Sequence, residues 1–255
     1  MAGADHHPLR ASWPRGSELA LRIGSALVLA PLAVGAAYVG DWPFALFWGV
    51  AAVGVLWEWT SMVARADQRS VLGAGAAALA HAERRIWVAG GVPYAGALAL
   101  APIVLRSDSE DGFLAVLFLF VIVWTTDIGA YFVGRAVGGP KLMPQVSPNK
   151  TWAGALGGMG AAVIVAVAVA KAAALTNLFA IAMLAVVLSV CAQGGDLFES
   201  VLKRRFGAKD SSRLIPGHGG LMDRLDGFLT ASVVAVLIGL ARGGFESPGR
   251  GLLVW

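Results

Sequence analysis

Apolar runs separated by short polar stretches dominate the chain. Most of these runs are about twenty residues long, and they occupy residues 19–39, 43–63, 86–105, 113–133, 152–170, 174–193 and, more briefly, 228–241. Because a helix of about 20 apolar residues can cross a bilayer, we predict an all-α, polytopic membrane protein with about seven transmembrane helices. Residues 71–82 are apolar but too short to cross upright, so we expect a re-entrant or interfacial segment there.

The polar stretches divide the chain into four parts. We expect residues 1–18 to form a flexible cytoplasmic N-terminus and residues 19–85 an N-terminal membrane region. Residues 86–241 form a membrane domain with the candidate catalytic residues, and residues 242–255 form a C-terminal tail. The run at 19–39 could instead be the apolar core of a signal peptide, but no soluble domain follows it.

Composition supports the membrane assignment. Hydrophobic residues make up 57% of the 255 residues and charged residues 14%, against about 25% charged residues in soluble domains. The single cysteine, Cys191, excludes an intrachain disulfide and is interpreted as a small buried hydrophobe. The isoelectric point of about 9.6 would suit nucleic acid. In a membrane protein, however, basic residues more often mark cytoplasmic loops, so we expect no nucleic-acid partner.

The basic residues also predict an orientation. If the N-terminus lies inside, then residues 1–22, 64–85, 134–151 and 194–227 share its side and carry 16 of the 20 Lys and Arg residues. This distribution follows the positive-inside rule. The two polar, glycine-rich stretches at 134–151 and 194–227 would then face the cytoplasm together, and they could enclose a polar active-site cavity.

The first polar block, GGDLFESVLKRRF, follows the sixth long run. On a helix, Asp196, Glu199 and Lys203 would share one face because they stand at i, i+3 and i+7. An ordinary helix ion pair would explain Glu199 and Lys203. It would not explain Asp196, because an acid near the bilayer centre costs at least about 2.5–3.5 kcal/mol.

The second block reads KDSSRLIPGHGGLMDRLDG. The glycines around His218 would let the backbone approach a ligand closely, and Asp223 and Asp226 would be helical neighbours. A hairpin would bring Asp223 back towards Asp196, and two carboxylates with phosphate oxygens commonly hold Mg²⁺. A solvated charged loop is the alternative. His218 could bind phosphate, bind metal or cap a helix.

The third block, GRAVGGPKLMPQVSPNKTWAG, places Lys, Ser and Thr among Gly and Pro, as in a phosphate-holding loop, although it lacks P-loop spacing. Asp127 precedes it and could either hydrogen-bond across helices or line a cavity. Glu58, between two tryptophans, is interpreted as a structural residue that snorkels to the membrane interface.

Together these blocks resemble the phosphatidate cytidylyltransferase (CDP-diacylglycerol synthase) family. The family pattern of S-x-x-K-R, K-D, P-G-H-G-G and D-R-hydrophobic-D stands here at Ser200, Lys203, Arg204, Lys209, Asp210, Pro216, Gly217, His218, Gly219, Gly220, Leu221, Asp223, Arg224, Leu225 and Asp226. Upstream elements match at 127–135, 141–142 and 147–151. The chain departs from the family at Ala153, where Glu or Gln is usual, in a shorter stretch at 64–85, and in residues 242–255.

The resemblance implies a nucleotidyltransferase of phospholipid biosynthesis that converts CTP and phosphatidate to CDP-diacylglycerol and diphosphate. It implies Mg²⁺ held by Asp196 and Asp223, and it leaves open a monovalent cation in addition. The implied catalytic residues are Asp196, Lys203, Asp223 and Asp226. The implied substrate-binding residues are Lys141, Ser147, Lys150, Thr151, Arg204, Lys209, Asp210, His218 and Arg224.

The same resemblance implies a multi-pass protein of the bacterial inner membrane, with its active site facing the cytoplasm, membrane lipids around it and a homodimer as its assembly. Two other functions remain open. A CTP-dependent lipid or polyprenol kinase would phosphorylate an alcohol and would need a general base such as His218 or an Asp. A secondary transporter would use Asp127, Asp196 and Glu58 for ion coupling, but it would not require the PGHGG motif.

Overall fold

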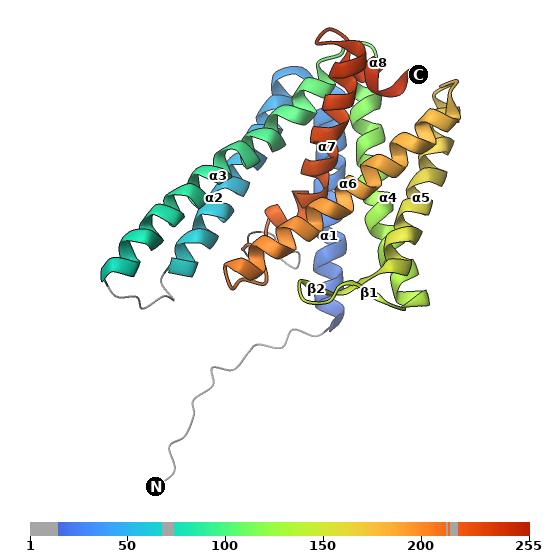
Figure 1. The fold of residues 1–255 in the computed structure, drawn as a ribbon. Coiled ribbons are helices and arrows are strands. Elements are labelled where there is room, and N and C mark those ends of the chain that lie inside the picture. The colour runs from blue at the N-terminus through green and yellow to red at the C-terminus, as the bar shows by residue number, and fades with distance from the viewer. Residues whose placement is uncertain (1–14, 68–73, 213, 215–218) are drawn as a thin grey trace.

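The computed structural model describes residues 15–67, 74–212, 214 and 219–255, which form eight helices and one two-stranded hairpin. The helices are α1 (Arg15–Val39), α2 (Asp41–Asp67), α3 (Ala74–Arg106), α4 (Gly112–Val137), α5 (Trp152–Ala172), α6 (Leu178–Arg205), α7 (Met222–Gly243) and α8 (Pro248–Leu253). In Figure 1, α2 and α3 form one antiparallel pair, α4 and α5 form another, and α6 and α7 cross between them.

The prediction of an all-α polytopic membrane protein is confirmed. Within the described residues, six helices are long and apolar enough to cross a membrane, and these are α2 to α7. The apolar part of α1 that the structure describes, Leu27–Val39, is shorter. Since a lipid environment requires each spanning segment to satisfy its own backbone, long helices are the expected answer to these apolar runs.

Of the stretch at 71–82, predicted to be a re-entrant or interfacial segment, residues 74–82 are helical and belong to α3, whose spanning part begins at Glu83. Residues 71–73 lie outside the described residues. The physical reason lies in Glu83, Arg84 and Arg85, which separate the two apolar runs but are good helix formers. One polar turn without Gly or Pro does not end a helix.

A small β-hairpin interrupts the helices between α4 and α5. Strands β1 (Lys141–Met143) and β2 (Ser147–Thr151) pair antiparallel, with Lys141 opposite Thr151 and Met143 opposite Ser147. Hydrophobic periodicity did not predict this element, because both strands are short and polar. The hairpin folds the predicted phosphate-holding loop back against the start of α5.

Small residues bring the helices close together where the site forms. A side chain added at Gly158 of α5 would place its Cβ 2.5 Å from the Thr126 carbonyl oxygen of α4, and one added at Gly195 of α6 would lie 2.5 Å from the Asp226 carbonyl oxygen of α7. Close approach at small residues is how helices associate in membranes. Deeper in the bundle, Trp48 of α2 stacks on Phe228 of α7 with ring centroids 4.7 Å apart.

The helix directions place the polar stretches at one end of the bundle. Helices α2, α4 and α6 end there, and α3, α5 and α7 begin there (Figure 1). The hairpin and the α6–α7 connection therefore lie at the same end, as the charge distribution predicted. The opposite end carries the loop at 107–111 and α8, where Leu252 and Leu253 are buried, so part of the predicted C-terminal tail is packed structure.

Candidate functional site

A cavity of about 1900 Å³ opens between α1, α2, α4, the hairpin, α5, α6 and α7. One part of its wall is apolar and comes mainly from α1, α2 and α4. The other part carries charged side chains from five elements and the α6–α7 connection. These charged residues are Asp127, Arg135, Lys141, Lys150, Asp196, Lys203, Asp210, Asp223, Arg224 and Asp226.

Lys150 connects the hairpin to α6. Its ammonium group forms an ion pair with the Asp196 carboxylate, and both side chains are partly accessible from the cavity. Thr151, the next residue, is the N-cap of α5, and its Oγ1 accepts a hydrogen bond from Gly154 N at 3.1 Å. This cap fixes the end of β2 and therefore the position of Lys150.

Lys203 lies between two acids on α6 and α7. Its Nζ is 3.2 Å from Glu199 Oε1 and 2.6 Å from Asp223 Oδ1. The predicted helical pair of Glu199 and Lys203 is thus present, but it belongs to a larger buried group in which Glu199 is fully enclosed. Such a group is stable only when its charges are matched, since unpaired buried charges are costly.

Asp223 stands in the first turn of α7 and is held mainly by backbone. Its Oδ2 accepts hydrogen bonds from Gly220 N at 2.9 Å and from Ser211 N at 3.1 Å. A carboxylate at a helix N-terminus is favoured by the free N–H groups and the helix dipole. These contacts fix Asp223 in place while leaving it at the cavity wall.

The register of α6 against α7 decides which charged groups pair. Asp127, Asp196 and Asp226 all line the cavity. Asp223 faces Lys203 and Ser211. The close approach of the two helices at Gly195 sets this register. The expected return of the chain thus places Asp223 and Asp196 in the same cavity wall, where each pairs with a different lysine.

The cavity carries carboxylates of the kind that can bind magnesium. Among the residues that the structure describes, no group of three or more His, Cys, Asp or Glu side chains is placed to hold a metal. Mg²⁺ usually takes one or two carboxylates together with phosphate oxygens, and the oxygen donors of Asp196, Asp223 and Asp226 suit it. The pair Asp196 and Asp223 stays a prediction.

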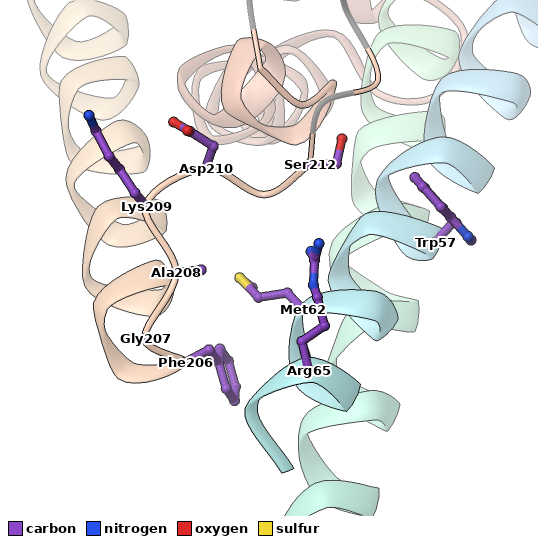
Figure 2. Close-up of a pocket in the computed structure, with 9 residues that line it drawn as sticks. All are labelled: Trp57, Met62, Arg65, Phe206, Gly207, Ala208, Lys209, Asp210 and Ser212. Carbon is purple, nitrogen blue, oxygen red and sulfur yellow. The ribbon is translucent and has the colours of Figure 1, made fainter. Parts of the chain in front are cut away.

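The remaining predicted residues divide into two groups. Lys141, Thr151, Asp210 and Arg224 line the cavity. The others lie elsewhere: Ser147 is outside the lining, Arg204 Nε donates to the Val146 carbonyl at 3.3 Å, and His218 is outside the described residues. Lys209 lines a smaller pocket of about 500 Å³ between the end of α2 and the α6–α7 connection, which Figure 2 shows. Asp210 lines both this pocket and the large cavity.

Sequence reasoning missed or misjudged three residues. Arg135 and Gln193 line the cavity, and their only sequence signal was a polar side chain at the polar end of an apolar run. The expectation that Glu58 snorkels is wrong, because its side chain is fully buried and its carboxylate binds the α6–α7 connection. For Asp127, where two roles were open, the structure places the residue in the cavity lining.

Fold and site together define an integral membrane protein with a cavity in which a charged wall adjoins an apolar one. Residues 81–241 match the Cytidylyltransferase family, and the chain belongs to this family of nucleotidyltransferases. It is 41% identical to the phosphatidate cytidylyltransferase of Brucella suis biovar 1 (strain 1330) over 253 residues, covering 88% of this chain and 94% of the relative. It is 43% identical over 148 residues to that of Haemophilus influenzae, covering 56% of this chain and 51% of the relative.

Proposed function

We propose that this protein joins CTP to phosphatidate, giving CDP-diacylglycerol and diphosphate. The observation that carries the proposal is one continuous cavity with a charged end and an apolar side. The triphosphate of a nucleotide requires the charged end, and the acyl chains of a lipid require the apolar side. Relatives that match most of the chain are named phosphatidate cytidylyltransferases.

The apolar side of the cavity suits acyl chains. It is formed by Leu29 and Leu32 of α1, Trp42 and Leu46 of α2, and Ile128 of α4. Several of these side chains are also exposed on the surface of the bundle, where a membrane would surround them. Small-molecule pockets usually measure about 300–1,000 Å³, so the volume of about 1900 Å³ leaves room for two substrates at once.

The reaction depends on neutralising the negative charge of the substrates and the leaving group more than on a general base. A phosphate oxygen of phosphatidate would attack the α-phosphorus of CTP, forming a new P–O bond while the bond to the bridging β-phosphate oxygen breaks and diphosphate leaves. A phosphate monoester is largely ionised near neutral pH, so no general base is required. The cations Lys141, Lys150, Lys203 and Arg224 would offset the charge of both substrates and of the leaving group.

Ion pairs within the protein place two of these cations. Asp196 holds Lys150, and Asp223 holds Lys203 at 2.6 Å, so both ammonium groups stay at the cavity wall. Prepositioned charge lowers the reorganisation that the reaction requires. We propose that Asp196 and Asp223 also hold Mg²⁺, with Asp226 in the same cavity wall, and that the bound ion would neutralise triphosphate oxygens.

The orientation is part of the proposal. The end of the bundle that carries the charged part of the cavity also carries the hairpin and the α6–α7 connection, and 16 of the 20 basic residues fall in the sequence segments predicted for that side. We infer that this end faces the cytoplasm of a bacterial inner membrane, where CTP is available.

The test is a product assay on purified protein. Incubation with CTP and phosphatidate should yield CDP-diacylglycerol and diphosphate in equal amounts, and EDTA should stop the reaction. Formation of CDP together with a newly phosphorylated lipid alcohol would identify a kinase instead. A protein that is folded in detergent yet forms neither product with Mg²⁺ present would refute the proposal.

A further inference from the structure

The carboxylate of Glu58 on α2 accepts hydrogen bonds from the connection between α6 and α7. Glu58 is fully buried. Its Oε1 accepts hydrogen bonds from Ser212 Oγ at 2.5 Å and Leu221 N at 2.8 Å, and its Oε2 accepts from Met222 N at 2.7 Å and Ser211 Oγ at 3.1 Å. Four donors thus surround two acceptor oxygens. All four come from the connection and the start of α7, although Glu58 lies more than 150 residues earlier in the chain.

These contacts give α7 its N-terminal cap from another helix. Leu221 occupies the N-cap position and offers no side-chain oxygen. The free N–H groups at the start of α7 instead have side-chain acceptors. Leu221 N and Met222 N donate to Glu58, and Gly220 N donates to Asp223. Free N–H groups at a helix start need such acceptors. Glu58 therefore does from α2 what a capping side chain usually does locally.

Ser211 joins Glu58 directly to the site. Its hydroxyl lies 3.1 Å from Glu58 Oε2 and 3.1 Å from Asp223 Oδ2, and its N–H donates to Asp223. Arg65, two turns after Glu58 on α2, donates to the Ser211 carbonyl at 2.5 Å. Figure 2 shows Arg65 and Ser212 facing each other across the pocket from α2 and the connection. Glu58 and Arg65 of α2 thus both hold Ser211.

The backbone at Gly220 has no spare room. A Cβ at Gly220 would lie 1.8 Å from Ser211 Oγ and 2.9 Å from both carboxylate oxygens of Glu58. The glycine therefore allows backbone, hydroxyl and carboxylate to meet. An apolar side chain could fill the place of Glu58 without the cost of a buried carboxyl group. The carboxylate is thus better explained by what it holds than by packing.

We propose that Glu58 is a positioning residue, which caps α7 from α2 and fixes Ser211, Ser212 and the backbone at 220–222 so that Asp223 and Lys203 keep their places in the cavity. The kinetic part of this inference rests on the proposed cytidylyltransferase function. The structural part does not. Glu58 acts through these groups and lies outside the cavity lining.

The test replaces Glu58 by glutamine, which has the same size. One of the two acceptor oxygens becomes an NH₂ group, which accepts no hydrogen bond, so either Leu221 N or Met222 N loses its acceptor. We expect kcat to fall by about 10- to 100-fold, because small misplacements of reacting groups have effects of that order. The KM for each substrate should stay within about twofold, since most of the cavity wall comes from α1, α2, α4 and the hairpin, which Glu58 does not hold in place. Hydrogen exchange of the backbone amides at 219–222 should become faster, with exchange in α4 and α5 unchanged.

Thr60→Val is the matched control. Thr60 lies on the same helix, but its hydroxyl bonds to the carbonyl of Leu56 within α2, so kcat and exchange at 219–222 should stay at wild-type values. Ser212→Ala is a second route if Glu58→Gln does not insert. It removes one donor to Glu58 and should give the same changes in smaller size.

Three results decide the matter. Wild-type kcat and wild-type exchange in Glu58→Gln would overturn the proposal. Faster exchange throughout all helices would also overturn it, because it would mean a general loss of stability. If wild-type protein forms no CDP-diacylglycerol, the proposed function fails, while the exchange comparison between wild type and Glu58→Gln still tests the cap.

Discussion

At the end of the bundle that carries the hairpin, Asp223 accepts backbone N–H groups and also pairs with Lys203 at the cavity wall. At the opposite end, Asp108 accepts backbone N–H groups from Glu110 and Asp111 at 3.0 Å and from Arg250 at 2.8 Å. Only 3% of Asp108 is exposed, and it lies outside the cavity lining. Both acids tie a loop to a helix, but only Asp223 presents its charge to a space where a ligand fits.

The contrast shows how to separate acids that serve the site from acids that serve the fold. Asp108 joins the loop at 107–111 to α8, and Arg242 secures α8 by donating to the carbonyls of Gly251 and Val254. Every one of these contacts is made within the protein. We therefore expect Asp223 to control turnover and Asp108 to control stability, and the following predictions test that division.

The largest effect should follow Asp223→Asn or Asp196→Asn. Each change removes a negative charge that holds a lysine at the cavity wall, and we expect activity to fall by at least about 10²–10³-fold. CTP-dependent formation of CDP-diacylglycerol is the measurement, with membrane insertion checked by yield in detergent. Near-wild-type turnover in either variant would contradict the roles assigned to these carboxylates.

Asp108→Asn should show the reverse pattern. An amide cannot accept all three backbone N–H groups, so we expect the free energy of unfolding to drop by about 1–3 kcal/mol. A thermal melt in detergent would detect the lower Tm. The kcat of the folded protein should equal that of wild type, and a lowered kcat would mean that the far end of the bundle contributes to catalysis.

Acid should reduce the difference between wild type and Asp108→Asn. Burial acts to raise the pKa of Asp108, but the N–H groups of Arg250, Asp111, Glu110 and Gly249 outweigh it and hold this pKa below its usual value. A depressed pKa stabilises the folded state above the unfolded-state value of about 3.9, and the gain disappears as pH falls through the folded-state value. The two Tm values should therefore converge below about pH 4, and a constant gap would contradict this origin.

The smallest effect should follow Arg242→Lys. The Arg242 guanidinium donates to two carbonyls and lies 3.6 Å from the centroid of the Trp255 ring. Lysine would keep the charge but would lack the planar group that donates in two directions and stacks on the ring. We expect a loss of stability of about 1 kcal/mol and unchanged turnover. Comparison with Arg65→Lys would sharpen the contrast, since Arg65 holds the turn next to Asp223 and its replacement should lower kcat.

Much of the site could be predicted from residue types alone. The charged stretches at one end of apolar runs, the helical spacing of Glu199 and Lys203, and the glycines before Asp223 are local patterns, and the structure contains each of them as expected. Glu58 shows the limit. Its neighbours in the sequence are tryptophans that suggest a membrane interface, while its four hydrogen-bond donors lie more than 150 residues away.

The sequence by itself determined the spanning helices, the side of the bundle that carries the charges, and the family pattern, because each depends on composition or spacing within a short stretch. Tertiary structure alone decided that Asp196 pairs with Lys150, that Asp223 pairs with Lys203, and that Glu58 caps α7. These pairings depend on the register and contact of helices. That register is set by where glycines such as Gly158 and Gly195 allow two backbones to meet, and no local period specifies such a meeting.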